Sequence, residues 1–219
     1  MGQSWHYPSP GSQPIVHFAE YHHMVPTRVT GSEDVPRLAR SLAQAYRFNP
    51  FVRWMFAEDL SATRLEGLFR SLVEFGVCHG LVYRSTEGDG AAIWFPPIGD
   101  ERYVPDHPPA DVAADTAEWS SGRRVAALQA LAASRPADPH FYLDAVGVVP
   151  SRRRLGVASD LLEPALAECD VKSIGAYLEN SDPANTSFYA RHGFEEVAQI
   201  VMPEGAPPIV SMWRPPQVG

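Results

Sequence analysis

Apolar residues recur along the chain at two spacings, one typical of helices and the other typical of strands. The first helical stretch has apolar side chains at intervals of three and four: Val35, Leu38, Ala39, Leu42, Ala45 and Tyr46. Ser32, which two acids follow, predicts the start of this helix, because serine is a favoured N-cap and acids suit the first turn. The helix is expected to stop near Asn49 and Pro50, and the same spacing predicts a second helix over about 62–79.

Shorter runs of β-branched and aromatic residues predict strands. Residues 81–85 and 91–95 are joined by Thr86–Gly90, a segment typical of a hairpin. Further strands are expected over 27–30, 140–149, 176–178, 194–202 and 209–214, and further helices over 110–134 with a break near 120–122, over 158–170 and over 185–192. Because helices and strands are interspersed without a repeat, the expected fold class is α/β (α+β).

The beginning of the chain does not share this patterning. Residues 1–24 are rich in Pro, Ser, Gly and His, and they predict an irregular N-terminal arm that contains a short strand at 15–18. Residues 25–219 have the length of one substantial domain, which can bury a core without disulfides or a structural metal. The expected organisation is therefore an arm followed by a single domain.

Composition and charge narrow the classes of function. The formal net charge of −8 argues against binding to nucleic acid or to an anionic membrane, because such binding needs an excess of Lys and Arg. No apolar run approaches the roughly 18 residues that span a bilayer, and no signal peptide is recognised, so a cytoplasmic location is expected. Cys78 and Cys169 lie far apart and are expected to be reduced and partly buried. No cluster of residues implies a metal.

The turn after the predicted strand 140–149 has the features of a phosphate site. Main-chain N–H groups at the start of the following helix have no partner inside the helix, and with the helix dipole they favour an anion. Gly156 and Ala158 are small enough to let phosphate oxygens approach the main chain. Three guanidinium groups of the turn can add charge-assisted bonds: Arg152, Arg153 and Arg154. The turn lacks the patterns of a Walker A loop and of GxGxxG, and by itself it is also compatible with a plain strand–helix turn.

Two blocks in this half of the chain resemble the GCN5-related N-acetyltransferase (GNAT) family. Arg153–Ala158 fits the family signature Q/R-x-x-G-x-G/A, between a strand and a helix. Tyr177–Phe194 is similar to the second block, in which an xNxxFYxxxGF segment follows the next strand. The resemblance covers roughly 27–214. It implies a mixed central sheet of about six to seven strands with helices on both faces, and an N-acetyltransferase that uses acetyl-CoA as cosubstrate.

Within the family, the likeness is to the puromycin N-acetyltransferases, through residues 29–37 and 202–205. It implies that the acceptor is a primary amine of a small molecule, of antibiotic or other xenobiotic type, and hence a role in antibiotic resistance. Residues 1–24 depart from this pattern and could reshape or cover the acceptor site.

The resemblance also implies which residues serve the reaction. The main chain of Val146, Gly147 and Val148 corresponds to the strand that bonds the pantetheine arm and orients the thioester. The turn corresponds to the pyrophosphate site: Arg153, Arg154, Leu155, Gly156, Val157, Ala158 and Ser159. Tyr189 stands at the position of the usual general acid, and a phenol with a pKa near 10 is protonated at neutral pH. Asn185, one helical turn earlier, is expected to bond the pantetheine amide.

The base and the acceptor pocket are less closely specified. Glu179, at the end of a strand, is the first candidate for the base, acting through water, and Asp144 is the second; either could instead bond nearby backbone or an arginine. The acceptor pocket is expected to use aromatic faces, which hold apolar or cationic groups. The aromatic candidates are Tyr46, Phe51, Trp54, Trp94 and Trp119, with those between 48 and 56 favoured.

The function that these residues favour is an active small-molecule N-acetyltransferase. One alternative is acetylation of a protein N-terminus or lysine, which would need an open groove for a peptide. Another is a module that binds an acyl-CoA without turning it over; Tyr189 and the intact turn argue against it. Monomer and homodimer are both left open.

Overall fold

The computed structural model describes residues 26–56, 60–97 and 122–217. The arm predicted over 1–24, with its strand at 15–18, lies outside the described residues. The same holds for residues 110–121 of the expected third helix, which include Trp119.

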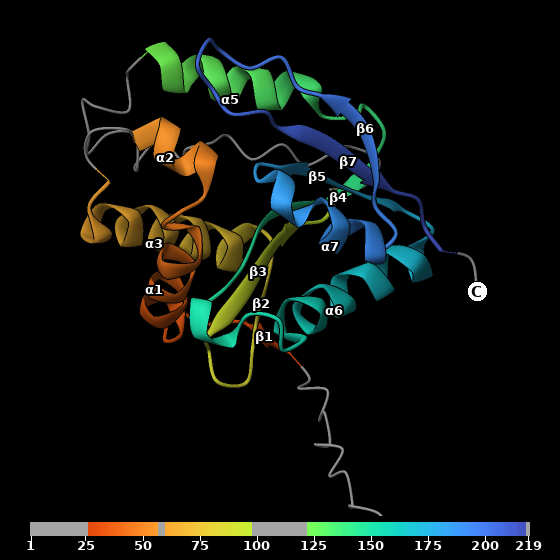
Figure 1. Ribbon diagram of the computed structural model, residues 1–219. Coiled ribbons are helices and arrows are strands. Elements are labelled where there is room, and N and C mark those ends of the chain that lie inside the picture. The colour runs from red at the N-terminus through yellow and green to blue at the C-terminus, as the bar shows by residue number, and fades with distance from the viewer. Residues whose placement is uncertain (1–25, 57–59, 98–121, 218–219) are drawn as a thin grey trace, which may run out of the picture.

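Seven strands form one mixed sheet in the spatial order β1-β2-β3-β4-β5-β7-β6 (Figure 1). The strands are β1 (Thr27–Val29), β2 (Leu81–Arg84), β3 (Gly90–Phe95), β4 (His140–Val148), β5 (Gly175–Asn180), β6 (Glu195–Gln199) and β7 (Val210–Arg214). Neighbouring strands are antiparallel, except that β4 and β5 are parallel. The mixed α/β sheet of six to seven strands that the sequence predicted is confirmed.

Helices cover both faces of this sheet (Figure 1). They are α1 (Val35–Tyr46), α2 (Pro50–Phe56), α3 (Ala62–His79), α5 (Gly122–Ser134), α6 (Val157–Lys172) and α7 (Thr186–Arg191), with single 3-10 turns at Pro150–Arg152 and Pro183–Asn185. α1 and α3 pack on one face, and α6 packs on the other. α6 also connects β4 to β5, since parallel neighbours need a crossover connection.

The alternation of side chains along β3 separates two hydrophobic cores. Ile93 and Phe95 belong to the core beneath α1 and α3, whereas Ala92 and Trp94 belong to the core beneath α6. All four side chains are fully buried, because β3 lies in the interior of the sheet with a helix layer on each side. The burial of apolar area in both cores stabilises the sheet that carries the site.

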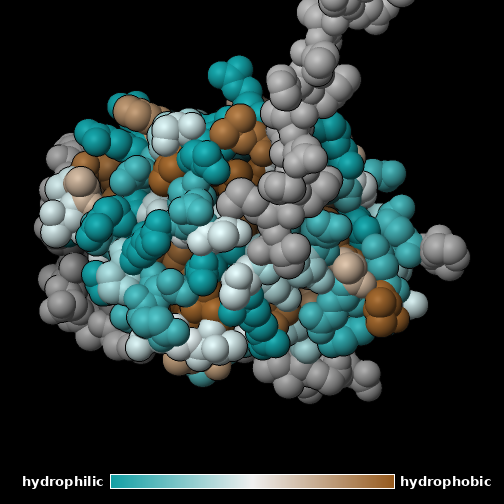
Figure 2. Space-filling view, turned by 90° about the horizontal axis from the view of Figure 1, so that it is seen from below, coloured by the Kyte–Doolittle hydropathy of each residue, from teal (hydrophilic) through white to brown (hydrophobic). Residues whose placement is uncertain are grey.

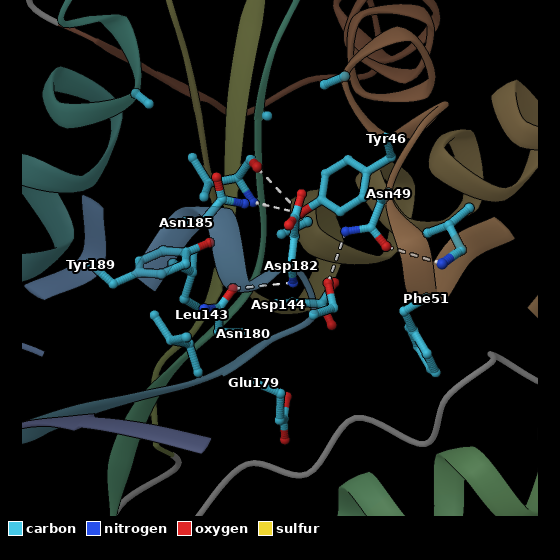
Figure 3. Close-up of a pocket in the computed structure, with 18 of the residues that line it drawn as sticks. Tyr46, Asn49, Phe51, Leu143, Asp144, Glu179, Asn180, Asp182, Asn185 and Tyr189 are labelled. Atoms are coloured by element: carbon cyan, nitrogen blue, oxygen red, sulfur yellow. Dashed lines mark hydrogen bonds between the residues drawn. The ribbon is translucent and has the colours of Figure 1, made fainter. Parts of the chain in front are cut away.

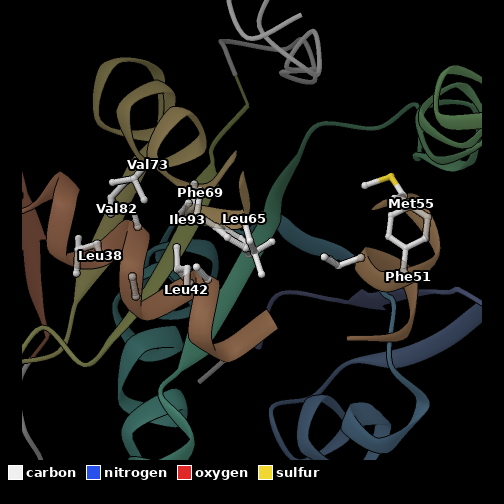
Figure 4. Close-up of a cluster of buried hydrophobic side chains, with 14 of the residues drawn as sticks. Leu38, Leu42, Phe51, Met55, Leu65, Phe69, Val73, Val82 and Ile93 are labelled. Carbon is white, nitrogen blue, oxygen red and sulfur yellow. The ribbon is translucent and has the colours of Figure 1, made fainter. Parts of the chain in front are cut away.

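The first core has a main group and an extension (Figure 4). In the main group, Leu42 of α1 lies beside Phe69 and Val73 of α3, over the sheet. Phe51 and Met55 of α2 lie apart from that group, on the side of α5 (Figure 4). This separation leaves α2 at the border of a cavity that is described below.

The start of α1 differs from the prediction. Its N-cap residue is Asp34 and not Ser32, and the helix begins at Val35. The main-chain oxygen of Ser32 accepts a hydrogen bond from the Val35 N–H at 3.2 Å, which makes Ser32 part of a preceding turn. The Asp34 carboxylate does not cap the helix, because it pairs with Arg84 of β2 at 2.9 Å.

Both cysteines are free thiols, but only one is buried. Cys169, a residue of α6, packs in the core beneath that helix, and burial raises its pKa to about 12, so this thiol is neutral at neutral pH. Cys78, in the last turn of α3, is exposed. The prediction of partial burial was therefore wrong for both thiols: α3 turns Cys78 toward solvent, and the α6 core encloses Cys169.

One face of the molecule has a mainly polar surface. On the face shown in Figure 2, hydrophilic residues dominate and hydrophobic ones appear in small groups between them. Among the described residues, no helix is both long enough and apolar enough to cross a membrane.

Candidate active site

The pairing of β4 with β5 ends partway along β4. His140–Leu143 pairs with Gly175–Leu178, and beyond Leu143 the described partner of β4 is β3 alone. Asp144 is an extra residue in β4 that interrupts its register with β3, and a bulge of this kind bends a strand. The edge of β4 that faces β5 is therefore open from Asp144 to Val148.

A cavity of about 780 Å³ occupies this opening and extends to both sides of it. One half, which we call the turn half, is bounded by the turn after β4, the start of α6 and α7. The other, the acceptor half, is bounded by α2, α3, α5, by Arg135 and Ile209, and by three residues of the strands, Tyr142, Asp144 and Glu179. Because the two halves meet between β4 and β5, two molecules bound in them would touch at the open edge of β4.

Most of the residues that the sequence singled out line this cavity. From the predicted CoA site these are Val146, Gly147, Val148, Arg153, Arg154, Gly156, Val157, Ala158, Ser159 and Asn185, and from the other predictions Tyr46, Phe51, Asp144, Glu179 and Tyr189. Leu155 does not line it, because its side chain points to solvent with 46% of its surface exposed.

The turn half has the geometry of an anion site. Gly156 precedes α6 with φ of +84°, a conformation that favours glycine, and no side chain caps the helix. The N–H groups of the first turn therefore need partners from outside the helix. Two nearby arginines of the turn have different partners within the protein. Arg152 pairs with Asp89 at 2.8 Å, and Arg153 donates to the main-chain oxygen of Ala45 at 2.8 Å.

Tyr46 and Tyr189 extend into the cavity from opposite sides (Figure 3). The Tyr46 hydroxyl lies 3.2 Å from the main-chain oxygen of Val146, to which it donates, and 3.3 Å from the Val146 N–H, from which it accepts. Burial raises the pKa of both phenols well above the ordinary 10.0, so both are protonated at neutral pH. Tyr189 can therefore act as a proton donor at the place where the two halves meet.

Glu179 lies in a buried polar cluster in the acceptor half, where it extends toward α5 (Figure 3). Its Oε1 is 3.2 Å from Nε of Arg135, and each of the two side chains is 6% exposed. The Arg135 guanidinium also lies over the ring of Tyr142, 4.1 Å from its centroid. Burial raises the pKa of Glu179, and Arg135 offsets part of that rise. A carboxyl with a raised pKa is a better proton acceptor than an ordinary surface glutamate.

The remainder of the acceptor half is apolar. α2 is anchored beside α5, since Arg124 Nε donates to the main-chain oxygen of Met55 at 2.7 Å. The apolar side chains that line this half are Phe51, Val52 and Met55 of α2, Leu68, Phe69 and Leu72 of α3, Leu128 and Leu131 of α5, and Ile209. This half can therefore enclose an apolar molecule.

Two of the aromatic predictions for the acceptor pocket were wrong. Trp94 is fully buried in the core beneath α6, on the face of the sheet opposite α1 and α3, and it does not line the cavity. Trp54 is also absent from the cavity wall; it stacks on Phe51, with ring centroids 6.0 Å apart. Phe51 and Tyr46 are the predicted aromatic residues that do reach the cavity.

Sequence reasoning missed several residues of the site. Arg135 and Tyr142 form the cluster around Glu179, and Asn49 donates to Ser181 Oγ at 3.0 Å beside the end of β5. The signal for Arg135 was weak: a charged residue just after an otherwise apolar helical segment. Its pairing with Glu179 joins positions 44 residues apart, which local pattern does not reveal.

The fold and one matched segment of the chain indicate the class of the protein. Residues 112–196 match the model of a family described as acetyltransferase (GNAT) domain. The structure is similar to one from Corynebacterium glutamicum described as histone acetyltransferase HPA2 and related acetyltransferase. In that comparison the identity is 26%, the TM-score is 0.66, and 90% of this chain and 99% of the other are covered. Residues 112–196 thus match a GNAT acetyltransferase domain, and the protein is an N-acetyltransferase.

Two further solved structures share the fold at lower identity. Arylalkylamine N-acetyltransferase 2 from Aedes aegypti is 12% identical, with a TM-score of 0.59 over 88% of this chain and 99% of that chain. A variant of agmatine N-acetyltransferase is 14% identical, with a TM-score of 0.53 over 86% of this chain and 98% of that chain. At these identities the likeness concerns the fold.

Proposed function

We infer that the protein transfers the acetyl group of acetyl-CoA directly to a primary amine of a small molecule, with both bound at once. The observation that carries this inference is that one continuous cavity joins an anion site at the start of α6 to an apolar pocket, through the gap between β4 and β5. A direct transfer needs two binding sites that meet, with a proton donor at their junction, where Tyr189 lies.

The residues of the turn half fit acetyl-CoA. The open edge of β4 offers main-chain groups of Val146 to Val148 to the pantetheine amides, and Asn185 offers a side-chain amide. The start of α6 offers N–H groups to a pyrophosphate, and a side chain at Gly156 would meet no protein atom within 4 Å, so there is room beside the turn. When bound, acetyl-CoA supplies a thioester whose acetyl group an amine can accept.

Two residues are assigned to proton transfer. Tyr189 donates a proton to the departing sulfur, because its phenol is protonated and lies at the junction of the halves. Glu179 accepts the proton of the amine through water, and Asp144 is the alternative acceptor. The pairing of Glu179 with Arg135 is compatible with this role, since the raised pKa brings the carboxyl closer to the pH of the reaction.

A small molecule is favoured over a peptide as the acceptor. The acceptor half is bounded by three helices and lined mainly by apolar side chains, and an open groove is what a peptide would need. Two proteins with the same fold are named for small amines, arylalkylamines and agmatine. The sequence likeness to the puromycin N-acetyltransferases adds an antibiotic or other xenobiotic amine as a specific possibility within this class.

A calorimetric titration of acetyl-CoA, with free CoA and ATP as controls, tests the inference first. We expect saturable one-to-one binding of acetyl-CoA and no binding of ATP, followed by thiol release when a panel of amines is added. The absence of binding at millimolar acetyl-CoA would contradict the function. Binding without thiol release from any amine or peptide would instead indicate a module that only holds the cofactor.

Replacement of Tyr189 by Phe tests the proton donor. We expect kcat to fall by about 10- to 100-fold, while the Kd for acetyl-CoA stays within a factor of about three, because only the hydroxyl is removed. Tyr83→Phe is the matched control, since Tyr83 is equally buried but lies outside the cavity wall. Unchanged turnover in Tyr189→Phe would remove Tyr189 from the mechanism.

A further inference from the structure

The walls of the acceptor half are apolar yet incompletely buried. Leu68 and Leu72 of α3, and Leu128 and Leu131 of α5, are only partly buried, although three of them, Leu68, Leu72 and Leu131, pack against the first core. All four line the cavity, where a ligand can cover part of their surface. An apolar molecule that covered these side chains would gain the free energy of their removal from water, which favours a ligand with a substantial hydrocarbon body.

The charges of this half are arranged for a cation. Asp144 and Glu179 are two carboxylates, and Arg135 is the one cation among the described residues of the acceptor half. Arg135 is already held by Glu179 at 3.2 Å and by the ring of Tyr142 at 4.1 Å, with 6% of its side chain exposed. A ligand carboxylate would have to compete for this engaged guanidinium and would lie near two other carboxylates, whereas an ammonium group would be attracted by both of them.

The same walls disfavour two other kinds of amine. Every residue of a peptide brings an N–H and a C=O that need partners, and leucine and phenylalanine side chains offer none. A polyamine would place its second ammonium group several bonds away from the carboxylates, between the leucines of α3 and α5. Both ligands would therefore bury polar groups without compensation.

On the basis of the proposed function, we propose that the acceptor is a monocationic primary amine on an apolar alkyl or aryl body that carries no carboxylate or phosphate. The ammonium end lies toward Asp144 and Glu179, and the body lies against α2, α3 and α5. The pocket thus selects by shape and apolar area at one end and by a single charge at the other.

A panel of matched acceptors tests this proposal by thiol release with the wild-type protein. We expect kcat/KM for 2-phenylethylamine to exceed that for phenylalanine, which adds only a carboxylate, by about 100-fold or more. It should also exceed that for spermidine and for a tetrapeptide with a free N-terminus. Along the series from butylamine to hexylamine, kcat/KM should rise about threefold per methylene group. A preference for phenylalanine, spermidine or the peptide overturns the proposal.

A substitution in the apolar wall gives a second test. Leu131→Asp adds a carboxylate to the wall, and it should raise the ratio of kcat/KM for 1,6-diaminohexane over hexylamine by about tenfold. Leu131→Asn is the control, because it has nearly the same shape without the charge. A ratio that rises equally in both variants overturns the proposal. If Leu131→Asp does not fold, the wild-type panel still decides.

The panel also separates this proposal from the function on which it rests. If acetyl-CoA binds and thiol is released with acceptors of another class, the acetyltransferase function stands and the substrate class proposed here falls. If acetyl-CoA does not bind, or if none of the acceptors releases thiol, both fall.

Discussion

Tyr46 occupies main-chain groups that we assign to the pantetheine arm. Its hydroxyl satisfies both the N–H and the C=O of Val146 on the open edge of β4. A ligand that uses the same groups must first displace the phenol, and this exchange costs part of the binding free energy. Tyr46 is therefore a residue whose removal should strengthen binding at the site.

Tyr46→Phe is expected to lower the Kd for acetyl-CoA by about threefold to tenfold, because a net hydrogen bond in a protein is worth about 1 kcal/mol. Calorimetry on both proteins measures the change. Tyr83→Phe, outside the cavity, is the control and should leave Kd unchanged. Weaker binding in Tyr46→Phe would mean instead that the hydroxyl holds β4 in the shape that the ligand needs.

In the role of base that we propose for it, Glu179 would link the buried cluster to the pH dependence of the reaction. A base acts when deprotonated, so the rate rises with pH through the pKa of the base, and burial raises the pKa of Glu179 above its ordinary 4.5. We expect a limb of rising kcat above that ordinary value in the wild type, and we expect Glu179→Gln to lose this limb together with most of the rate. Rate profiles over a range of pH measure it. A limb that persists in Glu179→Gln and disappears in Asp144→Asn would assign the base to Asp144.

At the scale of elements, the turn between β4 and α6 depends on one backbone conformation. Gly156 has φ of +84°, whereas Gly67, in the interior of α3, has an ordinary helical conformation. An added Cβ would meet no atom within 4 Å at either position. The two glycines therefore form a matched pair that differs in backbone conformation and not in steric room.

Gly156→Ala is expected to lower the free energy of unfolding by about 1 kcal/mol, because an L-residue is strained at this φ. It should also weaken acetyl-CoA binding, since the strain is relieved by movement of the turn to which we assign the pyrophosphate. Gly67→Ala, in contrast, should raise the free energy of unfolding by about 0.5–1 kcal/mol, since alanine favours an exposed helix interior. Urea unfolding measures the change in the free energy of unfolding for both variants. Changes of the same sign in the two variants would contradict this expectation.

At the scale of the whole molecule, one ion pair ties the last strand to the crossover helix. Arg214 of β7 donates Nη1 and Nη2 to the two carboxylate oxygens of Asp170 in α6, at 2.7 and 2.8 Å. The Gln217 N–H donates to the same carboxylate. The Arg214 side chain is only 7% exposed. The loss of the Asp170 carboxylate would therefore leave a buried guanidinium without its charge-assisted bonds from Nη1 and Nη2.

Asp170→Asn is therefore expected to lower the free energy of unfolding by about 1.5 kcal/mol near pH 7. The hydrogen bonds from Arg214 hold the pKa of Asp170 below its ordinary 3.8, so this stabilisation is fully present above 3.8 and is lost as the pH falls below it. The difference between wild type and variant should shrink near pH 3 in urea unfolding. Glu163→Gln, an exposed residue of the same helix, is the control, and an equal loss there would contradict the assignment.

Local pattern was sufficient for much of the fold. The helix predicted over 62–79 has those bounds, because its apolar spacing is regular and Ser61 caps it by accepting from the Arg64 N–H. The strand predicted over 140–149 ends one residue earlier, at Val148. Where local signals compete, prediction failed: Ser32 and Asp34 are both good N-caps, and the ion pair of Asp34 with Arg84 depends on a strand about 50 residues away.

The candidate site divides in the same way. The turn with Gly156 and the segment with Asn185 and Tyr189 are short stretches whose chemistry depends on their own residues, and they could be located from the sequence. The acceptor half could not, because its walls come from α2, α3 and α5 and depend on how these helices face one another. Trp94 shows why the sequence could not separate pocket residues from core residues, since an aromatic side chain suits a pocket and a core equally.

The sequence by itself determined the order of helices and strands, because this follows from periodicity, and it indicated the class of enzyme through the resemblance of two short blocks whose members are close in the chain. Only the tertiary structure decided that Tyr46 holds Val146, that Arg135 pairs with Glu179, and that the acceptor half is apolar with two carboxylates. The physical reason is that a pocket is made of surfaces left uncovered when distant elements pack, and one-dimensional pattern records the elements without their packing.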